Sequence, residues 1–187
     1  MPQHTVSKEE LATAAATEVF SRYGYARTTM GDIAAQAGIS RPALYLLFPD
    51  KDAVFAAVIW RMDAQKHRDI RAAIARLDGL DAKLLHACKS WGTHGFDLIE
   101  AHPDAADLFD LGFPAVRKVY DNFQVLVADL IRDQVQAAGI AEDPEVLARC
   151  LVFGMRGLRE TARSGKEMRR LITVQVGMLV RSIGGDI

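Results

Sequence analysis

Residues 29–48 contain the feature that most constrains the fold: two short helical segments joined by a tight turn at a glycine. Thr29 stands three positions before Asp32, which is the spacing of a helix N-cap, and Ser40 is placed to cap the second segment. Gly38 suits the turn because a residue without a Cβ can bend sharply without a steric clash. Two short helices with this turn are typical of a DNA-binding helix-turn-helix.

The residues before this motif predict a first helix that packs against it. Ser7 and Glu10 have capping-box spacing, and we expect the helix to run to about Tyr23 and to end at Gly24. Its expected apolar face is Leu11, Ala15, Val19 and Phe20, which would cover Ile33, Ala34, Ala37, Ile39 and Leu44. The positions left to be shared between core and solvent form the predicted recognition edge: Arg41, Pro42, Ala43, Tyr45 and Leu46.

The rest of the chain also predicts helices, because glycine and proline occur at intervals that separate helices. A long helix is expected from a cap at Asp50 to Gly79, followed by helices at 82–101, 103–110, 114–138, 144–163 and 166–183. The segment ITVQVGMLV at 172–180 alternates apolar residues as a strand does, but no second strand is available to pair with it. We therefore expect an all-α protein of about nine helices, with an N-terminal three-helix domain and a C-terminal helical domain.

Composition limits the partners of the chain less than the motif does. Lysine and arginine together number 23, and aspartate and glutamate 24, so any DNA contact must come from the local placement of a few cations. Cys88 and Cys150 are far apart and form no disulfide or zinc pattern. Neither a signal peptide nor an apolar run long enough to span a membrane is evident. We expect a cytoplasmic protein with no cofactor, no metal site and no membrane partner.

Residues 9–56 resemble the DNA-binding domain of the TetR (tetracycline repressor) family of transcriptional regulators. The resemblance rests on residues in the family's order and spacing: Phe20, Tyr23, Gly24, Tyr25, Thr28, Thr29, Ile33, Ala34, Ala37, Gly38, Ile39, Ser40, Leu44, Tyr45, Phe48 and Lys51. It implies a helix-turn-helix domain at 1–51 and a ligand-sensing and dimerisation domain at 52–187. The second domain resembles the family only in the number and lengths of its helices.

The resemblance also implies which residues contact double-stranded DNA. Thr29, Ser40, Tyr45 and Lys51 are expected near phosphates. Arg41 is the best candidate for a base contact, because a guanidinium pairs with guanine through two hydrogen bonds. Two alternatives remain open, namely Tyr45 as a core aromatic and Lys51 as a solvated cation. The full expected set is Thr28, Thr29, Ser40, Arg41, Pro42, Ala43, Tyr45 and Lys51; Pro42 and Ala43, together with Leu46, offer only shape or apolar contact with thymine methyl groups.

The last two helices are predicted to pair two copies of the chain. The helix at 166–183 is apolar on most of its circumference and needs burial on more than one side. Small residues at Ala148, Gly154 and Gly157 would allow close helix approach. The resemblance implies a homodimer through residues 144–183, while an intramolecular helical hairpin is the alternative.

The middle helices contain the candidate effector site. Aromatic side chains with a few polar groups are typical of a pocket for a mostly apolar ligand, and they are equally typical of a core. Trp91 and His94 are the favoured pair in the predicted ligand-binding set, which is Trp91, His94, Phe113, Tyr120 and Phe123. A metal site at His86, Cys88 and His94 is disfavoured, because residues two apart on a helix face different sides.

Together these features favour a ligand-responsive DNA-binding regulator, most consistent with a repressor that binds a palindromic operator as a dimer and is released by a small, mostly apolar molecule. Family precedent alone suggests repression. Two other functions remain as alternatives. One is a small helical enzyme using His94, Asp97 and Glu100, although no nucleophile motif, phosphate loop or paired metal ligands support it. The other is a helical interaction module that has lost DNA binding.

Overall fold

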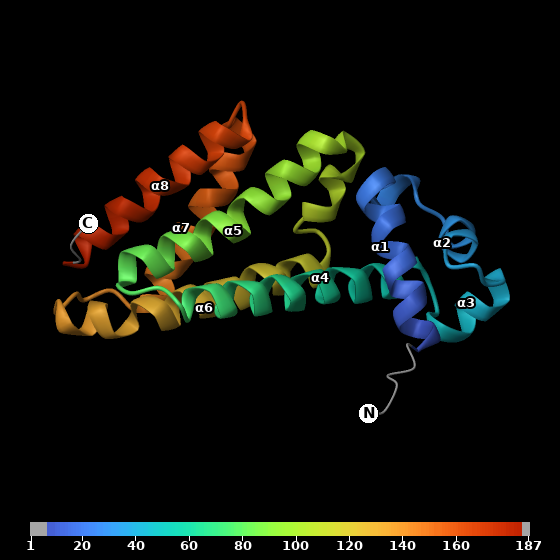
Figure 1. The fold of residues 1–187 in the computed structure, drawn as a ribbon, viewed down its shortest axis with the longest axis horizontal. Helices are drawn as coiled ribbons and strands as arrows, with labels where there is room; N and C mark the ends of the chain where they lie inside the picture. The colour runs from blue at the N-terminus through green and yellow to red at the C-terminus, as the bar shows by residue number, and fades with distance from the viewer. Residues whose placement is uncertain (1–6, 185–187) are drawn as a thin grey trace. The chain divides into compact units, whose positions relative to one another are not determined.

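A computed structural model describes residues 7–184, and within them the chain is helical, with no strand (Figure 1). The outer limits of the two expected domains, residues 1 and 187, lie outside the described residues. Eight α-helices and one 3-10 helix follow one another along this part of the chain. They form two compact units, one of residues 7–63 together with 98–117 and one of residues 64–97 together with 118–184.

The first unit contains α1 (Lys8–Arg27), α2 (Met30–Gln36), α3 (Arg41–Leu47), the start of α4 (Lys51–Ile74) and the 3-10 helix η1 (Pro103–Phe109). Ser7 and Glu10 close the expected capping box at the start of α1. The sequence predicted that this helix ends at Gly24, but α1 continues past it. Gly24 has a φ of 74°, a backbone conformation that would be strained for most other residues, and it kinks the helix. Helical structure resumes beyond the kink and continues to Arg27.

The core of the first unit follows most of the predicted pattern, although Ala37 and Ile39 are only half-buried. Phe20, Ile33 and Leu44 are fully buried, which confirms that α1 covers the two short helices. Leu11, however, is 53% exposed, so its assignment to this core was wrong. The apolar face of α1 is instead built largely from alanines, including Ala12 and Ala16, which allow the helices to approach closely.

The second unit contains the rest of α4, most of α5 (Leu80–Ala101), nearly all of α6 (Pro114–Ala137), α7 (Pro144–Thr161) and α8 (Gly165–Ser182). Ser164 caps α8 by accepting a hydrogen bond from the backbone of Glu167. In Figure 1, α7 and α8 are joined by a tight turn and run back along one another. The segment that alternated like a strand lies inside α8, where Ile172, Val176 and Val180 are buried one turn apart.

None of the helices in residues 7–184 combines the length and hydropathy that a membrane span requires.

Candidate nucleic-acid interface

Local hydrogen bonds fix the turn between α2 and α3. The Thr29 hydroxyl accepts from the backbone N–H of Asp32, and the Asp32 carboxylate accepts from the Thr29 backbone at 2.8 Å. Hydrogen bonds from the Thr29 side chain and backbone lower the pKa of Asp32. Gly38 adopts a φ of 65°, and the N–H of Ile39 then returns to the carbonyl of Ala34 at 3.0 Å. The turn therefore has the geometry that its sequence predicted.

One side of α3 is buried, and this determines which side chains the other side exposes to solvent. Leu44 and Phe48 are buried, so the helix is anchored at its centre and at its end. Ala43 is half-buried. The exposed positions are Arg41, Pro42, Tyr45 and Leu46, with Ser40 exposed at the N-cap. We call Arg41, Pro42, Tyr45 and Leu46 the recognition edge.

Arg41 and Tyr45 are associated before any partner is present. They lie four positions apart on α3, and the guanidinium sits 5.7 Å from the centroid of the tyrosine ring. One guanidinium nitrogen donates to the tyrosine hydroxyl at 3.4 Å. Tyr45 is 43% exposed, which contradicts the alternative that it is a core aromatic. This pair places a cation and a phenolic hydroxyl side by side on the recognition edge.

Lys51 is tied into the first unit by two hydrogen bonds. Its Nζ donates to the carbonyl of Tyr25 at 2.9 Å and to that of Thr28 at 3.0 Å, and lies 3.9 Å from the centroid of the Tyr25 ring. The ammonium thus satisfies carbonyls at the C-terminal end of α1, where a cation is favourable. The alternative that Lys51 is merely solvated is wrong. Since an ammonium has three N–H donors, one is left for a further acceptor.

Two of the expected DNA-contact threonines differ in their surroundings. Thr29 is exposed beside the start of α2. Thr28 is buried, and its hydroxyl donates to the carbonyl of Gly24 at 2.6 Å. Thr28 therefore stabilises the end of α1 and does not belong to the exposed surface.

Sequence analysis missed the residues that hold the kink of α1 in place. The carboxylate of Asp107 in η1 accepts hydrogen bonds from the backbone N–H groups of Tyr25 and Ala26, both at 2.8 Å. Gly24 packs so closely against η1 that a Cβ would lie 2.0 Å from the carbonyl oxygen of Asp104. These contacts join positions about 80 residues apart, and no local pattern announces them. The only signal in the sequence is the glycine at position 24, because glycine readily adopts the positive φ that is found there.

Tyr25 is the centre of a small aromatic cluster in the same unit. Its ring lies 5.0 Å from that of Phe55 and 4.7 Å from that of Phe113. Its hydroxyl donates to the carboxylate of Asp52. Burial, and then the hydrogen bond with Asp52, raise the pKa of Tyr25 to about 12. The phenol therefore stays protonated and continues to donate at neutral pH.

The five residues predicted to bind a ligand are divided between the two units. Phe113 belongs to the aromatic cluster of the first unit. In the second unit, the ring of Trp91 stacks on that of Phe123 at 4.4 Å and meets the ring of Tyr120 edge-on at 5.1 Å. Tyr120 and Phe123 are buried, and His94 is exposed. Three of the predicted residues thus pack against one another as a core does.

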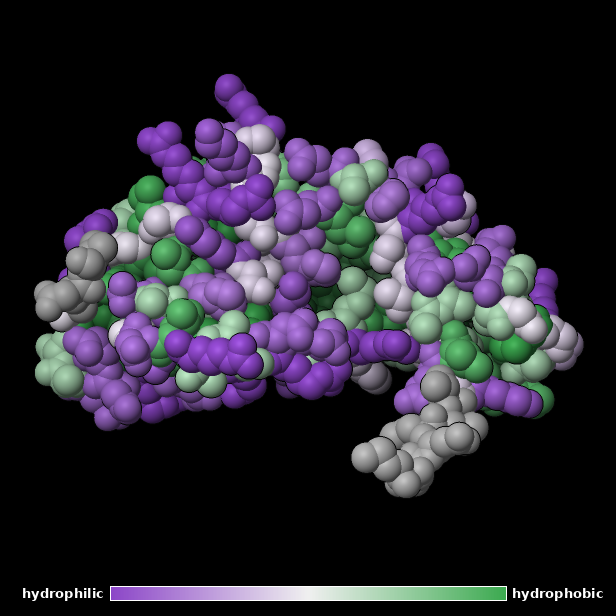
Figure 2. Space-filling view, viewed as in Figure 1, coloured by the Kyte–Doolittle hydropathy of each residue, from purple (hydrophilic) through white to green (hydrophobic). Residues whose placement is uncertain are grey.

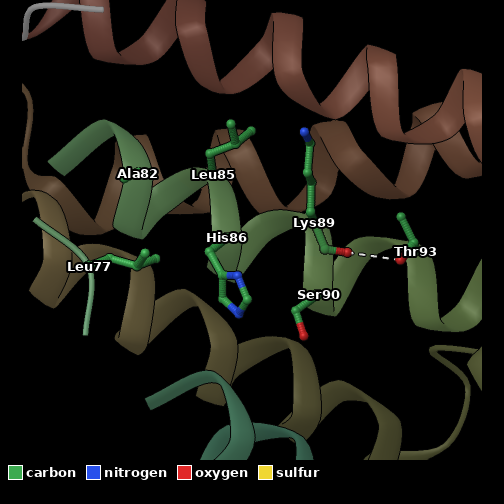
Figure 3. Close-up of a pocket in the computed structure, with 7 residues that line it drawn as sticks. All are labelled: Leu77, Ala82, Leu85, His86, Lys89, Ser90 and Thr93. Atoms are coloured by element: carbon green, nitrogen blue, oxygen red, sulfur yellow. Dashed lines mark hydrogen bonds between the residues drawn. The ribbon is translucent and has the colours of Figure 1, made fainter. Parts of the chain in front are cut away.

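A groove of about 490 Å³ lies along the other side of α5 in the second unit. It is lined by Leu77, Ala82, Leu85, His86, Lys89, Ser90 and Thr93. Figure 3 shows the side chains of Leu85 and Lys89 pointing to one side of α5 and those of His86 and Ser90 pointing to the other. The Thr93 hydroxyl donates to the carbonyl of Lys89 at 3.0 Å and is therefore already engaged. The lining combines aliphatic surface with one permanent cation and no carboxylate.

The outward faces of α7 and α8 carry exposed apolar side chains. Val146 and Phe153 lie on α7, and Val174 and Met178 on α8, all of them exposed. Figure 2 shows hydrophobic residues among hydrophilic ones on the surface over α8. Gly157 faces open space, since an added Cβ would meet no atom within 4 Å. Within residues 7–184, the last two helices therefore carry exposed apolar surface.

Comparison with known proteins agrees with this geometry. Residues 12–58 match the family model described as "Bacterial regulatory proteins, tetR family". The chain is 26% identical over 186 positions to the "HTH-type transcriptional repressor Rv1474c" of Mycobacterium tuberculosis, covering 91% of this chain and 90% of that protein.

Solved structures share the fold over almost the whole chain. A transcriptional regulator from Cytophaga hutchinsonii superposes with a TM-score of 0.75 at 23% identity, covering 94% of this chain and 97% of that one. The regulator FadR from Bacillus subtilis, solved in complex with stearoyl-CoA, superposes with a TM-score of 0.69 at 18% identity, covering 95% and 98%. The likeness extends beyond the helix-turn-helix to the helices of the second unit.

Proposed function

From the premise that this chain belongs to the TetR family of DNA-binding transcriptional regulators, we propose that it is a repressor that binds a palindromic operator as a homodimer and releases it on binding a small effector. The observation that carries the proposal is the recognition edge of α3, where Arg41 and Tyr45 are exposed and paired on a helix anchored by Leu44. A pre-arranged edge of this kind loses little side-chain entropy on docking into a major groove.

The proposed contacts divide into two kinds. Arg41 supplies the base contact, by pairing with O6 and N7 of a guanine. Thr29, Ser40, Tyr45 and the remaining donor of Lys51 approach phosphates and fix the register of the domain on the duplex. Thr28 contributes indirectly, because its hydroxyl holds the end of α1 from which Lys51 is positioned.

A second copy of the chain is the proposed cover of the α7 and α8 surface. The exposed residues Phe153, Val174 and Met178 give this surface an apolar centre. Gly157 leaves room there for a close approach between helices. Two-fold pairing through residues 144–183 would place two α3 helices about 34 Å apart, in successive major grooves of a palindromic site.

The proposed effector is an amphipathic molecule with an aliphatic part and an anionic group. In the groove on α5, Leu77 and Leu85 would contact the aliphatic part and Lys89 the anion. A structural neighbour of the same fold was solved with an acyl-CoA, which has both features. Trp91, Tyr120 and Phe123 form the packed cluster of the second unit, and a ligand in the groove would act on that packing.

Operator binding by the purified dimer tests the proposal. An operator selected from random duplexes, together with DNA upstream of the gene, is titrated at two salt concentrations with the wild type and two arginine variants. Arg41→Ala should weaken selective binding by at least about tenfold. Arg71→Ala, an exposed arginine on α4, is the matched control and should leave binding unchanged. A folded protein that selects no sequence would refute the proposed function.

Effector release is tested on the same complex. An acyl-CoA should dissociate the wild-type complex, and Lys89→Gln should require a higher concentration while binding the operator normally. Equal sensitivity in both proteins would remove Lys89 from the proposed effector site.

A further inference from the structure

Leu46 is the most exposed large hydrophobic residue in the described part of the chain. Its exposed fraction is 88%, whereas that of Met178, the next in order, is 61%. Two residues before and two after it, Leu44 and Phe48 are buried, so the position of Leu46 on the outside of α3 follows from the anchoring of the helix. The exposure is therefore built into the packing of the first unit.

The recognition edge consists of two rows, each of two residues four positions apart. Arg41 and Tyr45 form the polar row, joined by the hydrogen bond and the ring contact described above. Pro42 and Leu46 form the apolar row, and both are exposed. Ala43, the remaining small apolar residue near this edge, is half-buried. An apolar row beside a polar one would be complemented by a partner surface with a matching apolar feature.

The major groove offers one such feature. Of the groups that base edges present there, only the C5 methyl of thymine is apolar. We propose that Leu46, supported by Pro42, is a specificity-determining residue that contacts a thymine methyl group in each half-site, next to the guanine bound by Arg41. This inference rests on the proposed function, since it names the bases that the recognition edge distinguishes.

Uracil provides a sharp test, because it differs from thymine only by the missing methyl and keeps the same hydrogen-bonding edge. The selected operator is synthesised with uracil at one symmetric pair of thymines at a time, and binding is measured with the wild-type dimer. At the contacted pair, loss of a methyl contact in each half-site should lower affinity about fourfold per half-site and about fifteenfold for both. The other pairs should change affinity little.

Two leucine variants test whether Leu46 is responsible for the preference for thymine over uracil. Leu46→Ala should bind the thymine and uracil operators equally, and because the side chain is exposed the variant should unfold as the wild type does. Leu11→Ala, a leucine exposed on α1, is the matched control and should keep the full preference for thymine.

Each outcome separates this inference from the proposed function. Selective operator binding with a thymine preference that Leu46→Ala abolishes supports the inference. Selective binding with no preference at any thymine pair, or a preference that survives in Leu46→Ala, overturns it while leaving the proposed function intact. Absence of selective binding to any operator overturns both.

Discussion

Replacing Asp107 by alanine removes the acceptor of two backbone amides at the kink of α1. Because Gly24 departs from helical geometry, the N–H groups of Tyr25 and Ala26 have lost their acceptors in the preceding turn. The two carboxylate oxygens of Asp107 each take one of them at 2.8 Å. The substitution therefore tests whether η1 stabilises the helix that carries the DNA-binding motif.

The expected cost follows from the surroundings of the two amides. A hydrogen bond to a charged group contributes about 1.5–3 kcal/mol, and a donor left buried without a partner carries a desolvation penalty. The bond to Tyr25 is partly buried and should contribute fully, whereas the exposed amide of Ala26 can bind water instead. We expect Asp107→Ala to lower the free energy of unfolding by about 2–4 kcal/mol. Asp107→Asn, which keeps one acceptor oxygen, should cost about half as much.

Urea unfolding of the protein measures this cost, and hydrogen exchange localises it. Each unit contains one tryptophan, Trp60 in the first and Trp91 in the second, so fluorescence of single-tryptophan variants follows each unit separately. The amides of Tyr25 and Ala26 should exchange faster in Asp107→Ala than in the wild type.

Asp104→Ala is the matched control for this prediction. It removes the neighbouring ion pair with Arg27, whose two side chains are largely exposed, and should cost no more than about 1 kcal/mol. The reasoning fails if Asp107→Ala is no more destabilising than Asp104→Ala, or if amide exchange at the kink is unchanged.

Two further predictions concern packing and pH. An added Cβ at Gly92 would lie 2.9 Å from Ile172 and 3.3 Å from Met155, both buried, so Gly92→Ala should lower the free energy of unfolding of the second unit by about 1–3 kcal/mol. An added Cβ at Gly157 meets no atom of the same chain, so Gly157→Ala should not strain the packing within the second unit, although it could weaken the proposed dimer. Equal destabilisation of the monomeric chain by both changes would contradict this account. The pKa of Tyr25 is raised from 10.0 to about 12 by burial and by its hydrogen bond to Asp52, so its contribution to stability is complete below pH 10 and is lost as the pH rises from there towards 12. Tyr25→Phe should remove that part of the alkaline loss of stability, and a pH profile identical to that of the wild type would show that this phenol does not titrate as described.

The sequence predicted the helix-turn-helix well because its determinants are local. Thr29, Gly38 and Ser40 act on residues within four positions, so capping and turn chemistry are visible in the printed sequence. The helix α4 ends at Ile74, before the expected limit at Gly79. The other helix limits were close, apart from the end of α1. There a glycine acts as a kink because η1 supplies, from about 80 residues away, the acceptor that the next turn needs.

The sequence left open whether the aromatic residues of the middle helices line a pocket or fill a core. Trp91, Tyr120 and Phe123 have the composition of a pocket, but large rings gain the most when they bury one another, and in this chain they do so. The groove on α5 is lined by residues such as Leu85 and Lys89, which have the spacing of any exposed helix face. Periodicity shows which residues share a face, but it does not show which faces stay uncovered.

The rigidity of the recognition edge bears on how an effector could act. Leu44 and Phe48 anchor α3 in the core, Gly38 fixes its entry, and Lys51 ties the start of α4 to the end of α1. Reshaping the edge would break several of these contacts at once, whereas moving the first unit as a body breaks none of them. In the proposed dimer, an effector that favours a different separation of the two α3 helices would therefore lower operator affinity while leaving each recognition edge unchanged. A single copy of the chain should then bind a half-site equally well whether or not the effector is bound.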